Sequence, residues 1–412
     1  MTGSRTGRPD EAGRAGPADP TTRDLRLLRS VVEELAPIPR LPTSAGERRA
    51  AELIRRRLDG LGCRAVVEET PARGSYAAPI GLLSAAAVAG ALVAGRGHRV
   101  LGSAGAAMAC LGIADDITGR WMLARRALIP PRRTSTVVAE TGDSQARRVL
   151  CLLAHHDAAP SGVVFHQGIH AWLARRHPAV IERMTSNPPL WWPVLAGPAA
   201  VSLGSAIGSH RLRRAGLLAG LASLAAMLDI GRRPAVPGAN DNLSGVAALV
   251  AVAGALQRDP VHGVRVLLVS AGAEEALQEG IRGFGRRHFP RLPVAGTWFL
   301  NLDTVGSGRL VLLEAEGPIR LRGYHPGFKD LVSECAAARG IPLIRGLRSR
   351  SSTDGSVPNR HGYRTATVVS VDERKLIPNY HLPSDLPQNL DYSCVLGAAR
   401  LAEAVARRIA SG

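Results

Sequence analysis

Apolar residues near the start of the chain recur every three to four positions, which is the spacing of an amphipathic helix. This spacing covers residues 24–35 and again 47–61, and Ser44 stands where an N-cap would precede the second helix. Residues 64–69 have the character of a β-strand. The chain is therefore expected to begin with two helices and a strand.

Short apolar runs farther along predict strands, with helical patterns between them. Residues 149–154 have no polar interruption, as expected for a strand that is buried on both faces. The expected strands are 135–140, 149–154, 264–270, 297–304, 309–314 and 366–371. The expected helices are 244–256, 281–288, 327–339 and 393–409. This alternation predicts an α/β fold, with a mixed central sheet and helices on both of its faces.

Two long segments, 76–130 and 160–236, interrupt the alternation. Each contains a pair of stretches rich in Ala, Gly, Leu and Val, joined by a short basic turn. The stretches are 78–95 with 100–114, and 191–208 with 215–230; the second turn is 209–214. Trp121, Trp191 and Trp192 flank the pairs, where the aromatic belts of membrane proteins are expected. We interpret the pairs as two inserted helical hairpins in a catalytic domain spanning residues 23–410.

Two alternatives exist for these hairpins. Each stretch is near the lower length limit for crossing a bilayer, so a buried hairpin of a soluble protein is one interpretation. Four stretches with basic turns and flanking tryptophans favour membrane insertion, and small residues let membrane helices pack closely. Asp229 counts against insertion, because a carboxylate exposed to lipid is costly. Membrane lipid is therefore an expected partner.

The N-terminal residues bear on the cellular compartment of the catalytic domain. Residues 1–22 lack an apolar signal segment, so we expect a disordered tail rather than a secretion signal. Two hairpins return the chain to the same side each time, and we therefore place the catalytic domain in the cytoplasm. Five cysteines without a Cys-x-x-Cys spacing fit a reducing compartment and argue against a thiolate zinc site.

The net charge is +18 and comes almost entirely from arginine, since Lys329 and Lys375 are the only lysines. No basic run is interleaved with aromatic residues as a nucleic-acid groove would require, so nucleic acid is not expected as a partner. General surface chemistry explains the charge, and attraction to anionic lipid or acidic substrates is the alternative.

Candidate chemistry lies at strand ends and loops. His155 and Asp157 follow the buried strand 149–154, at the position where α/β sheets place ligand sites. Alone they indicate little, because a histidine beside a strand end is more often an ordinary hydrogen-bonding residue. Asp241 lies in a Gly/Pro/Asn-rich turn, which has plain turn chemistry as its alternative.

Acidic residues follow two more strands. Glu274 and Glu275 come after 264–270, where adjacent acids would repel each other unless a cation or shared proton relieved them. Asp303 ends an apolar strand, a setting in which an unpaired carboxylate is disfavoured. His381 lies on a polar loop and would by itself be an ordinary surface residue.

Together these residues carry a family resemblance. The motifs AHHD, GANDNLSG, AEE, NLDTVG and YHLPSD resemble those of the co-catalytic zinc aminopeptidases, a family that includes transferrin-receptor-like domains and glutaminyl cyclases. The resemblance covers residues 24–409 without the two inserts, and it implies a zinc-peptidase/phosphorylase-like fold.

The resemblance also implies roles. It assigns one zinc ion to His155 and Asp303, a second to Glu275 and His381, and Asp241 as the bridge between them. Glu274 would be the general base and Asp157 the acid behind His155. The implied activity is removal of the N-terminal residue of a peptide by water activated between two zinc ions. A single-zinc glutaminyl cyclase and a non-catalytic membrane scaffold of the same fold are the alternatives.

The sequence also departs from the family's pattern. Gly355 follows Asp354 where the family has a histidine after an acid, so we leave Asp354 outside the site. The segment 160–236 stands between His155 and Asp241, where the family has a short connection. This insert is therefore expected beside the active site, where it would restrict which substrates enter.

Overall fold

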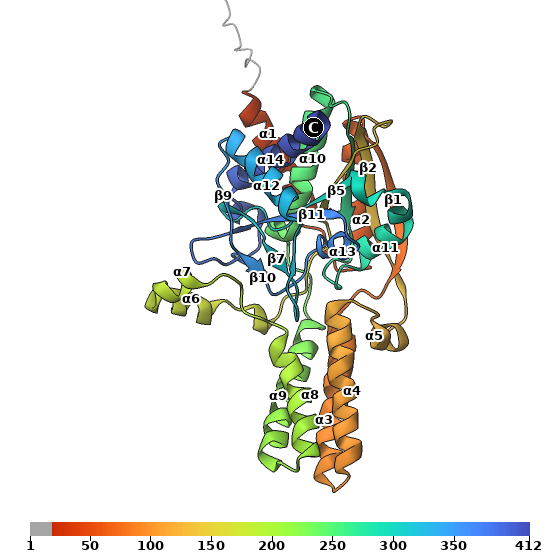
Figure 1. Ribbon diagram of the computed structural model, residues 1–412, viewed down its shortest axis with the longest axis vertical. Coiled ribbons are helices and arrows are strands. Elements are labelled where there is room, and N and C mark those ends of the chain that lie inside the picture. Colours follow the sequence, from red (N-terminus) through yellow and green to blue (C-terminus); the bar gives the residue numbers. More distant parts are fainter. Residues whose placement is uncertain (1–18) are drawn as a thin grey trace, which may run out of the picture.

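The computed structural model describes residues 19–412, and its centre is a mixed eight-stranded sheet with helices on both faces, as predicted (Figure 1). The sheet has the order β1-β2-β4-β3-β5-β11-β6-β9. Its strands are β1 (Arg64–Ala72), β2 (Arg132–Gly142), β3 (Val149–His155), β4 (Arg265–Ala271), β5 (Thr297–Leu302), β6 (Arg309–Leu312), β9 (Leu343–Ile344) and β11 (Arg364–Val371). A small second sheet contains β7 (Ala315–Glu316), β8 (Arg322–Gly323) and β10 (Arg348–Ser349).

Four parallel strands occupy the middle of the large sheet. β3 pairs in parallel with both β4 and β5, and β11 pairs in parallel with β5. The carboxyl ends of these strands therefore lie along one edge. In such sheets that edge is where ligands bind.

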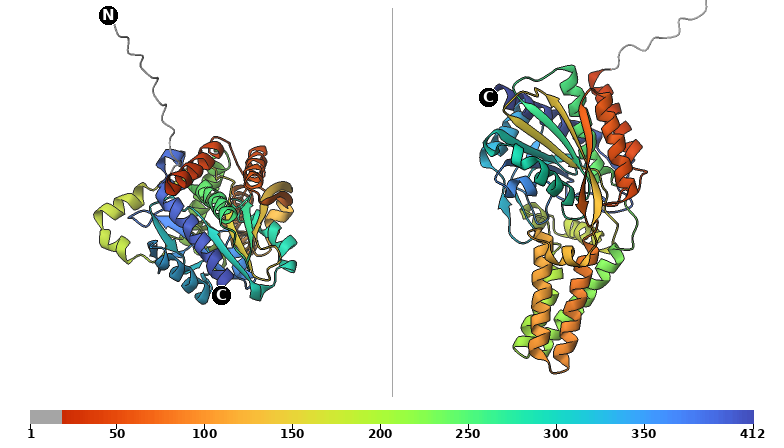
Figure 2. Two further views of the ribbon diagram at one scale, coloured as in Figure 1. Left: turned by 90° about the horizontal axis from the view of Figure 1, so that it is seen from above. Right: turned by 90° about the vertical axis from the view of Figure 1, so that its right-hand side faces the viewer.

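The two layers of helices are held by alternate side chains of the strands. In β3, Leu150 and Leu152 belong to one buried cluster, whereas Cys151 and Leu153 belong to the cluster on the other face. The first face is covered by α1 (Pro20–Leu35), α2 (Ala45–Gly60), α10 (Ser244–Arg258), α12 (Pro326–Ala338) and α14 (Tyr392–Ser411). The second is covered by α11 (Glu279–His288) and α13 (Ser356–Arg360). The sheet is thus sandwiched, as the right-hand view of Figure 2 shows.

The strongly periodic elements lie close to their predicted bounds. Ser44 caps α2 as predicted, with its hydroxyl accepting a hydrogen bond from the Glu47 amide at 3.1 Å. The expected tail extends too far, because residues 20–22 already belong to α1; residues 1–18 lie outside the described part of the chain. The pattern missed only short pieces, including α5 (Leu123–Leu128), α13 and β7 to β10.

A four-helix bundle projects from the domain beyond one end of the sheet (Figures 1 and 2). It consists of the two inserted hairpins, α3 (Ala77–Gly95) with α4 (Arg99–Thr118) and α8 (Trp192–Ala206) with α9 (His210–Ile230). The expected basic turn 209–214 is wrong in extent, since α9 begins at His210 with Ser209 as its cap. The Ser209 hydroxyl accepts from the Leu212 amide, which lets the basic residues join the helix.

The helices of the bundle touch through their backbones. A Cβ atom on Gly102 would stand 2.4 Å from the Gly90 carbonyl oxygen, and one on Gly216 would stand 2.6 Å from the Val201 nitrogen. Some large apolar side chains, among them Ile80, Ile113 and Met227, form a buried cluster, but many others point outward. The exposed ones are Leu82, Leu92, Val100, Leu101, Met108, Leu111, Trp192, Leu203, Ile207, Leu218, Leu221 and Leu228.

In the part of the chain that the structure describes, three helices are long and apolar enough to cross a membrane. Two of them are α3 and α4 of the first hairpin. The third contains α10 and is 94% buried inside the domain, so it is a core helix. Length and composition are therefore compatible with membrane insertion of the first hairpin, whereas α8 and α9 of the second hairpin are not among these helices.

The second insert contains more than a hairpin. Residues 160–190, which we call the arm, precede α8 and contain a short 3-10 turn (Val163–Phe165), α6 (Gly168–Arg176) and α7 (Pro178–Arg183). Figure 1 shows α6 and α7 extending sideways from the junction between the bundle and the domain. The arm has weak apolar spacing, which explains why the sequence pattern did not predict it.

Candidate metal centre

The predicted site residues converge at the carboxyl edge of the sheet. His155 ends β3, Glu274 and Glu275 follow β4, and Asp303 follows β5. His381 comes from the loop after β11, and Asp241 lies in the turn Ala239–Leu243 directly before α10. All six side chains are buried. The chain thus brings together groups that are up to 226 positions apart, because parallel strands align their ends.

Asp241 lies between two histidines. Its Oδ1 is 3.2 Å from Nε2 of His155, and its Oδ2 is 3.2 Å from Nε2 of His381. The same nitrogen of His381 is 3.2 Å from Oε2 of Glu275. Ligand atoms of His155, Asp241 and Glu275 lie within 4.8 Å of one another. A carboxylate that presents one oxygen to each of two histidines has the arrangement needed to bridge two cations.

Several of these atoms lack a hydrogen-bond partner among the described residues. They are Asp241 Oδ2, Glu275 Oε1 and both ring nitrogens of His381. Buried polar atoms are nearly always paired, and leaving one unpaired is costly. Imidazole nitrogens and carboxylate oxygens are the ligands that Zn²⁺ prefers in proteins. The donor set therefore fits zinc.

The pKa shifts of the buried carboxylates also indicate a cation in the site. Burial, supported by the charges of Asp241 and Glu275, raises the pKa of Asp303 to about 7. Burial likewise raises the pKa of Glu275 and, together with nearby carboxylates, lifts that of Glu274 well above its usual range. At Asp241 the effect of burial is outweighed by His155 and His381, which hold its pKa below the usual range. So many buried carboxylates need positive charge nearby.

Asp157 acts mainly on the adjacent glutamates. Its carboxylate accepts hydrogen bonds from the backbone amides of Glu274 and Glu275, at 3.1 and 3.0 Å. Nδ1 of His155 is 3.5 Å from the Asp157 carboxylate and 3.3 Å from its backbone oxygen. Asp157 therefore orients both the first histidine and the Glu-Glu pair.

Two polar residues that the sequence analysis did not single out hold the Asp241 turn in place. Asp385 accepts hydrogen bonds from the amides of Asn240 and Asp241, at 2.8 and 3.1 Å. Asn242 donates to the Leu302 carbonyl oxygen and accepts from the Thr304 amide, so it ties the turn to the strand that carries Asp303. The peptide bond between Asp241 and Asn242 is cis. The signal for both residues was present, since each belongs to a quoted motif.

Gln278 and Asp354 extend the site around Glu274. Gln278 donates to Oε1 of Glu274 at 2.9 Å and to the Ser352 carbonyl oxygen at 3.1 Å. Asp354, which the sequence analysis left outside the site, is buried, and neither of its carboxylate oxygens has a hydrogen-bond partner in the described chain. After burial, its negative charge is among the causes that raise the pKa of Glu274. The family resemblance gave a signal, since Asp354 lies where the family has an acid, but it was set aside because Gly355 stands in place of the histidine.

The backbone around the site is held in unusual conformations. Ala273, Gln278, Thr304 and His381 have φ values of 47°, 59°, 52° and 55°, which side chains other than glycine rarely adopt. Such residues cluster where the surrounding structure over-determines a functional geometry. Each of the four is itself a site residue or lies next to one.

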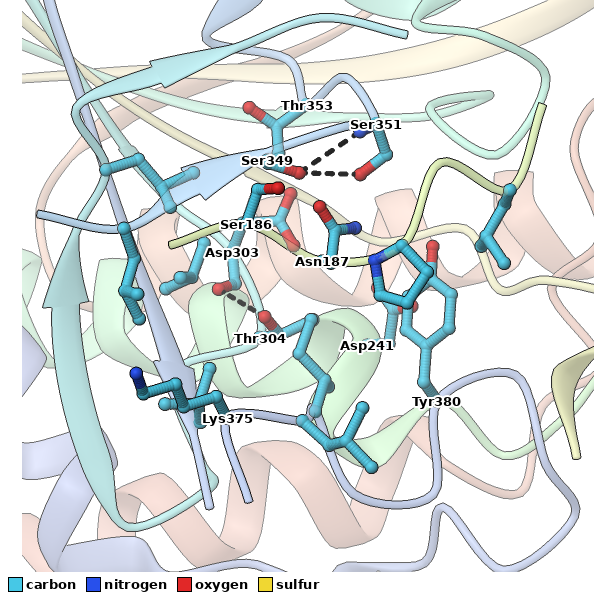
Figure 3. A pocket seen from close by; sticks show the side chains of 18 of the residues that line it. Ser186, Asn187, Asp241, Asp303, Thr304, Ser349, Ser351, Thr353, Lys375 and Tyr380 are labelled. Carbon is cyan, nitrogen blue, oxygen red and sulfur yellow. Dashed lines mark hydrogen bonds between the residues drawn. The ribbon is translucent and has the colours of Figure 1, made fainter. Parts of the chain in front are cut away.

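A cavity of about 260 Å³ opens over this cluster (Figure 3). Asp241 and Asp303 line it together with the hydroxyl-bearing residues Ser349, Ser351 and Thr353 (Figure 3). The arm supplies a wall with Ser186 and Asn187, and Phe165 of the arm packs edge-on against His381 with ring centroids 4.4 Å apart. The second insert therefore borders the site, as the sequence predicts.

Comparisons with known proteins agree with this geometry. The model of peptidase family M28 matches residues 225–406, a segment that contains Asp241, Glu274, Glu275, Asp303 and His381. The search of curated proteins found no match to the chain. The family match and the structural neighbours below confirm the predicted resemblance to the co-catalytic zinc metallopeptidases.

Solved structures share the fold at low identity. BSAP, a zinc aminopeptidase from Bacillus subtilis, is 13% identical with a TM-score of 0.54, covering 92% of this chain and 94% of that one. The aminopeptidase from Aneurinibacillus sp. strain AM-1 is 12% identical with a TM-score of 0.54, covering 92% of each chain. A glutaminyl cyclase from Bacteroides thetaiotaomicron is 13% identical with a TM-score of 0.55, covering 93% and 97%.

The family match covers less than half of the chain and indicates a similarity to peptidases. Both aminopeptidases and glutaminyl cyclases share the fold, so the fold alone does not distinguish these two activities.

Proposed function

We propose that this protein is a two-zinc exopeptidase that hydrolyses the N-terminal peptide bond of peptides and is attached to a membrane by its helical bundle. The observation that carries the metal assignment is the position of Asp241, with one carboxylate oxygen 3.2 Å from each of two histidines. A site with a single metal ion would not explain why Asp241 lies close to both histidines. The bridging role of Asp241 therefore favours two ions.

The remaining ligands follow from the family resemblance and from burial. His155 and Asp303 would hold one ion, and Glu275 and His381 would hold the other. Each of these side chains is almost fully buried, so none can turn to solvent for its polar partners. Asp157 and Asp385 support this set by fixing the backbone on either side of it.

Glu274 is the proposed general base. When bound, the zinc ions would polarise the scissile carbonyl group and lower the pKa of the attacking water. The Glu274 carboxylate accepts the proton of that water and later gives it to the leaving amine. Gln278 donates to Oε1 of Glu274 and so leaves its other oxygen available for this proton transfer.

The shape of the cavity supports an exopeptidase. The arm closes one side of it through backbone pairing between Ser186 and Arg348, and the Arg348 amide donates to the Thr185 carbonyl oxygen at 2.8 Å. A cavity of about 260 Å³ with the arm along one side accommodates the end of a peptide. We therefore place the terminal residue of the substrate inside the cavity.

Membrane attachment rests on the surface of the bundle. Glycine and alanine make its closest helix contacts beside a buried apolar cluster, and its exposed positions include many leucine, valine, isoleucine and methionine side chains. In water such a surface would be a large exposed apolar patch, which soluble proteins avoid. In lipid the same arrangement is favourable, because small residues allow close packing and large ones contact the acyl chains.

The proposal is tested by zinc content and product analysis on the full chain purified in detergent. Wild-type protein should hold about two zinc ions and release free amino acid from unblocked peptides but not from N-acetylated ones. Glu274→Gln should keep its zinc and lose about 10²–10⁴-fold in kcat. Glu403→Gln on α14, far from the site, is the matched control and should behave like wild type.

A glutaminyl cyclase is the second candidate because structures of that class share the fold to the same extent. It would hold about one zinc ion and convert an N-terminal glutaminyl peptide to a pyroglutamyl product without releasing an amino acid. The same assay therefore separates the two activities. Metal-free protein with neither activity would contradict both and leave a membrane scaffold.

A further inference from the structure

Exposed large apolar side chains are concentrated in the two inserts. Within residues 19–412, all of them except Val66, Val294 and Ile319 lie between Leu82 and Leu228. The bundle accounts for about half of these. The others lie in the arm and in the chain around α5, at the level where the bundle meets the domain (Figure 1). Proposed membrane attachment of the bundle does not by itself explain this second group.

The helix α6 of the arm has two different faces. Ile169 and Trp172 are 84% and 56% exposed, and Arg176 continues their stripe one turn further. His170 faces the other way, with Nε2 3.3 Å from the Arg374 carbonyl oxygen of the domain. The helix therefore rests on the domain with one face and presents isoleucine, tryptophan and arginine outward.

The arm is also strongly basic. Arg175, Arg176 and Arg183 are exposed and form no ion pair with any residue from 19 to 412. Glu182 is the only acidic residue in the arm. An exposed helix with a tryptophan, large aliphatic residues and unpaired arginines has the composition of a helix that lies in the interface of an anionic membrane.

The chain around α5 has the same character on another side of the bundle (Figure 1). Leu123 and Leu128 are exposed, and Arg126 lies between them. Just before them, the Arg120 guanidinium lies over the exposed ring of Trp121, 4.1 Å from its centroid. Two separate elements at the root of the bundle thus combine apolar and basic groups, as expected if both meet one flat surface.

We propose that the arm lies on an anionic lipid surface, with Ile169 and Trp172 in the interface and its arginines on the headgroups. This inference rests on the proposed attachment of the bundle to a membrane, and it adds a second contact with a distinct chemistry. Charge complementarity identifies the occupant, because the outward face of the arm combines apolar side chains with an excess of arginine.

Lipid contact of the arm would also affect the cavity. Two hydrogen bonds hold the arm against the cavity wall. The Gln167 side chain donates to the Ile377 carbonyl oxygen at 2.7 Å, and Lys375 donates to the Met184 carbonyl oxygen at 2.9 Å. Ser186 and Asn187 of the arm line the cavity itself. The position of the arm on the lipid therefore sets one wall of the substrate site.

The test uses full-length chain in which Ile169→Cys carries an environment-sensitive fluorophore and Cys110→Ser removes the partly exposed native thiol. The labelled protein is reconstituted into vesicles of phosphatidylcholine alone or with phosphatidylglycerol. A quencher attached to the lipids should quench position 169 strongly in the anionic vesicles and weakly in the neutral ones. The same label at Asp259→Cys, after the end of α10 remote from the site, should remain unquenched in both.

Charge reversal provides the matched variants. Arg175→Glu with Arg176→Glu should lose most of the quenching at position 169 in anionic vesicles. Arg26→Glu with Arg408→Glu makes the same charge change on α1 and α14 and should keep it. Flotation of every variant with the vesicles reports on the bundle independently of the arm.

The outcomes are distinguishable. If the protein floats but position 169 stays unquenched in anionic vesicles, the arm proposal is wrong and bundle attachment stands. If the protein does not float, membrane attachment by the bundle is wrong, and the arm proposal, which depends on it, is wrong as well. If position 169 becomes protected in detergent as the protein concentration rises, a second copy covers the arm and the lipid assignment is overturned.

Discussion

The domain and the bundle differ in where they place their large apolar residues. The domain encloses leucine, valine and phenylalanine between its sheet and helices, as proteins do in water. The bundle encloses glycines such as Gly90, Gly102 and Gly216 beside a smaller apolar cluster, and it turns many of its leucines outward. The hydrophobic effect therefore explains the domain in water, whereas the bundle has the composition of helices packed in lipid.

The two regions meet through a buried ion pair next to the active site. Arg125 of α5 and Asp116 of α4 are both almost fully buried and lie 2.8 Å apart. Arg125 also donates to the Ala276 carbonyl oxygen, directly after Glu275, and lies 3.8 Å from Glu279. The first insert is thus anchored to the loop that carries the proposed base, so the two regions are mechanically connected.

The largest expected effect is confined to the domain. Asp241→Asn removes the negative charge that would bridge two ions but keeps the size of the side chain. We expect the zinc content to fall to one ion or fewer and hydrolysis to fall to background, because both metal positions depend on this carboxylate. Metal analysis and peptide hydrolysis check this, and flotation with vesicles should be unchanged. Two retained zinc ions would contradict the bridging role.

A smaller effect is expected from the residue that supports Asp241 through the backbone. Asp385→Asn replaces one of the two carboxylate oxygens that accept the amides of Asn240 and Asp241. Changes to groups behind metal ligands typically cost about 10–100-fold in metal affinity or activity. Competition with a zinc chelator measures the affinity. Unchanged affinity and activity would mean that the turn is rigid without Asp385.

The stability of the bundle should depend on the size of the side chains at its helix contacts and not on their charge. Gly102→Leu places a side chain where a Cβ already meets Gly90 at 2.4 Å, and overpacking of this kind costs about 1–3 kcal/mol. Gly105→Leu is the matched control, because no atom lies within 4 Å of its Cβ position. Thermal unfolding in detergent should separate the two variants, with zinc content equal in both. Equal stability of the two variants would contradict the conclusion that close glycine contacts hold the bundle together.

The smallest expected effect is a pH dependence of the metal-free protein. Burial raises the pKa of Asp303 to about 7 in the fold, above its value in the unfolded chain. The folded state therefore binds this proton more tightly, and stability decreases as pH rises from about 4 to 7. Zinc should remove this decrease.

Unfolding temperatures of chelated and zinc-loaded protein at pH 5 and pH 7.5 test this effect. Chelated Asp303→Asn should lose less stability over this interval than chelated wild type. A zinc effect that is the same at both pH values would show that repulsion among the buried carboxylates is not what the metal relieves.

The sequence was sufficient where one pattern dominated. The strand β3 is an apolar run up to His155, and β4 and β5 are mostly apolar. The residues that follow these strands could be placed at one edge because parallel strands align their ends. The two hairpins were equally clear from composition. In both cases the signal is local and repeated over many residues.

The rest depended on tertiary contacts. The arm is short and weakly periodic, and its position is set by pairing with β10 and by Lys375. Gln278 and Asp354 became part of the site only because the loops after β4 and β10 meet in space. No spacing rule along the chain reports such a meeting.

The most direct test of the account is a structure of the purified protein with anomalous scattering measured at the zinc edge. We expect two peaks separated by the Asp241 carboxylate, one beside His155 and Asp303 and the other beside Glu275 and His381. A single peak, or peaks away from these residues, would contradict the two-zinc centre and with it the proposed exopeptidase.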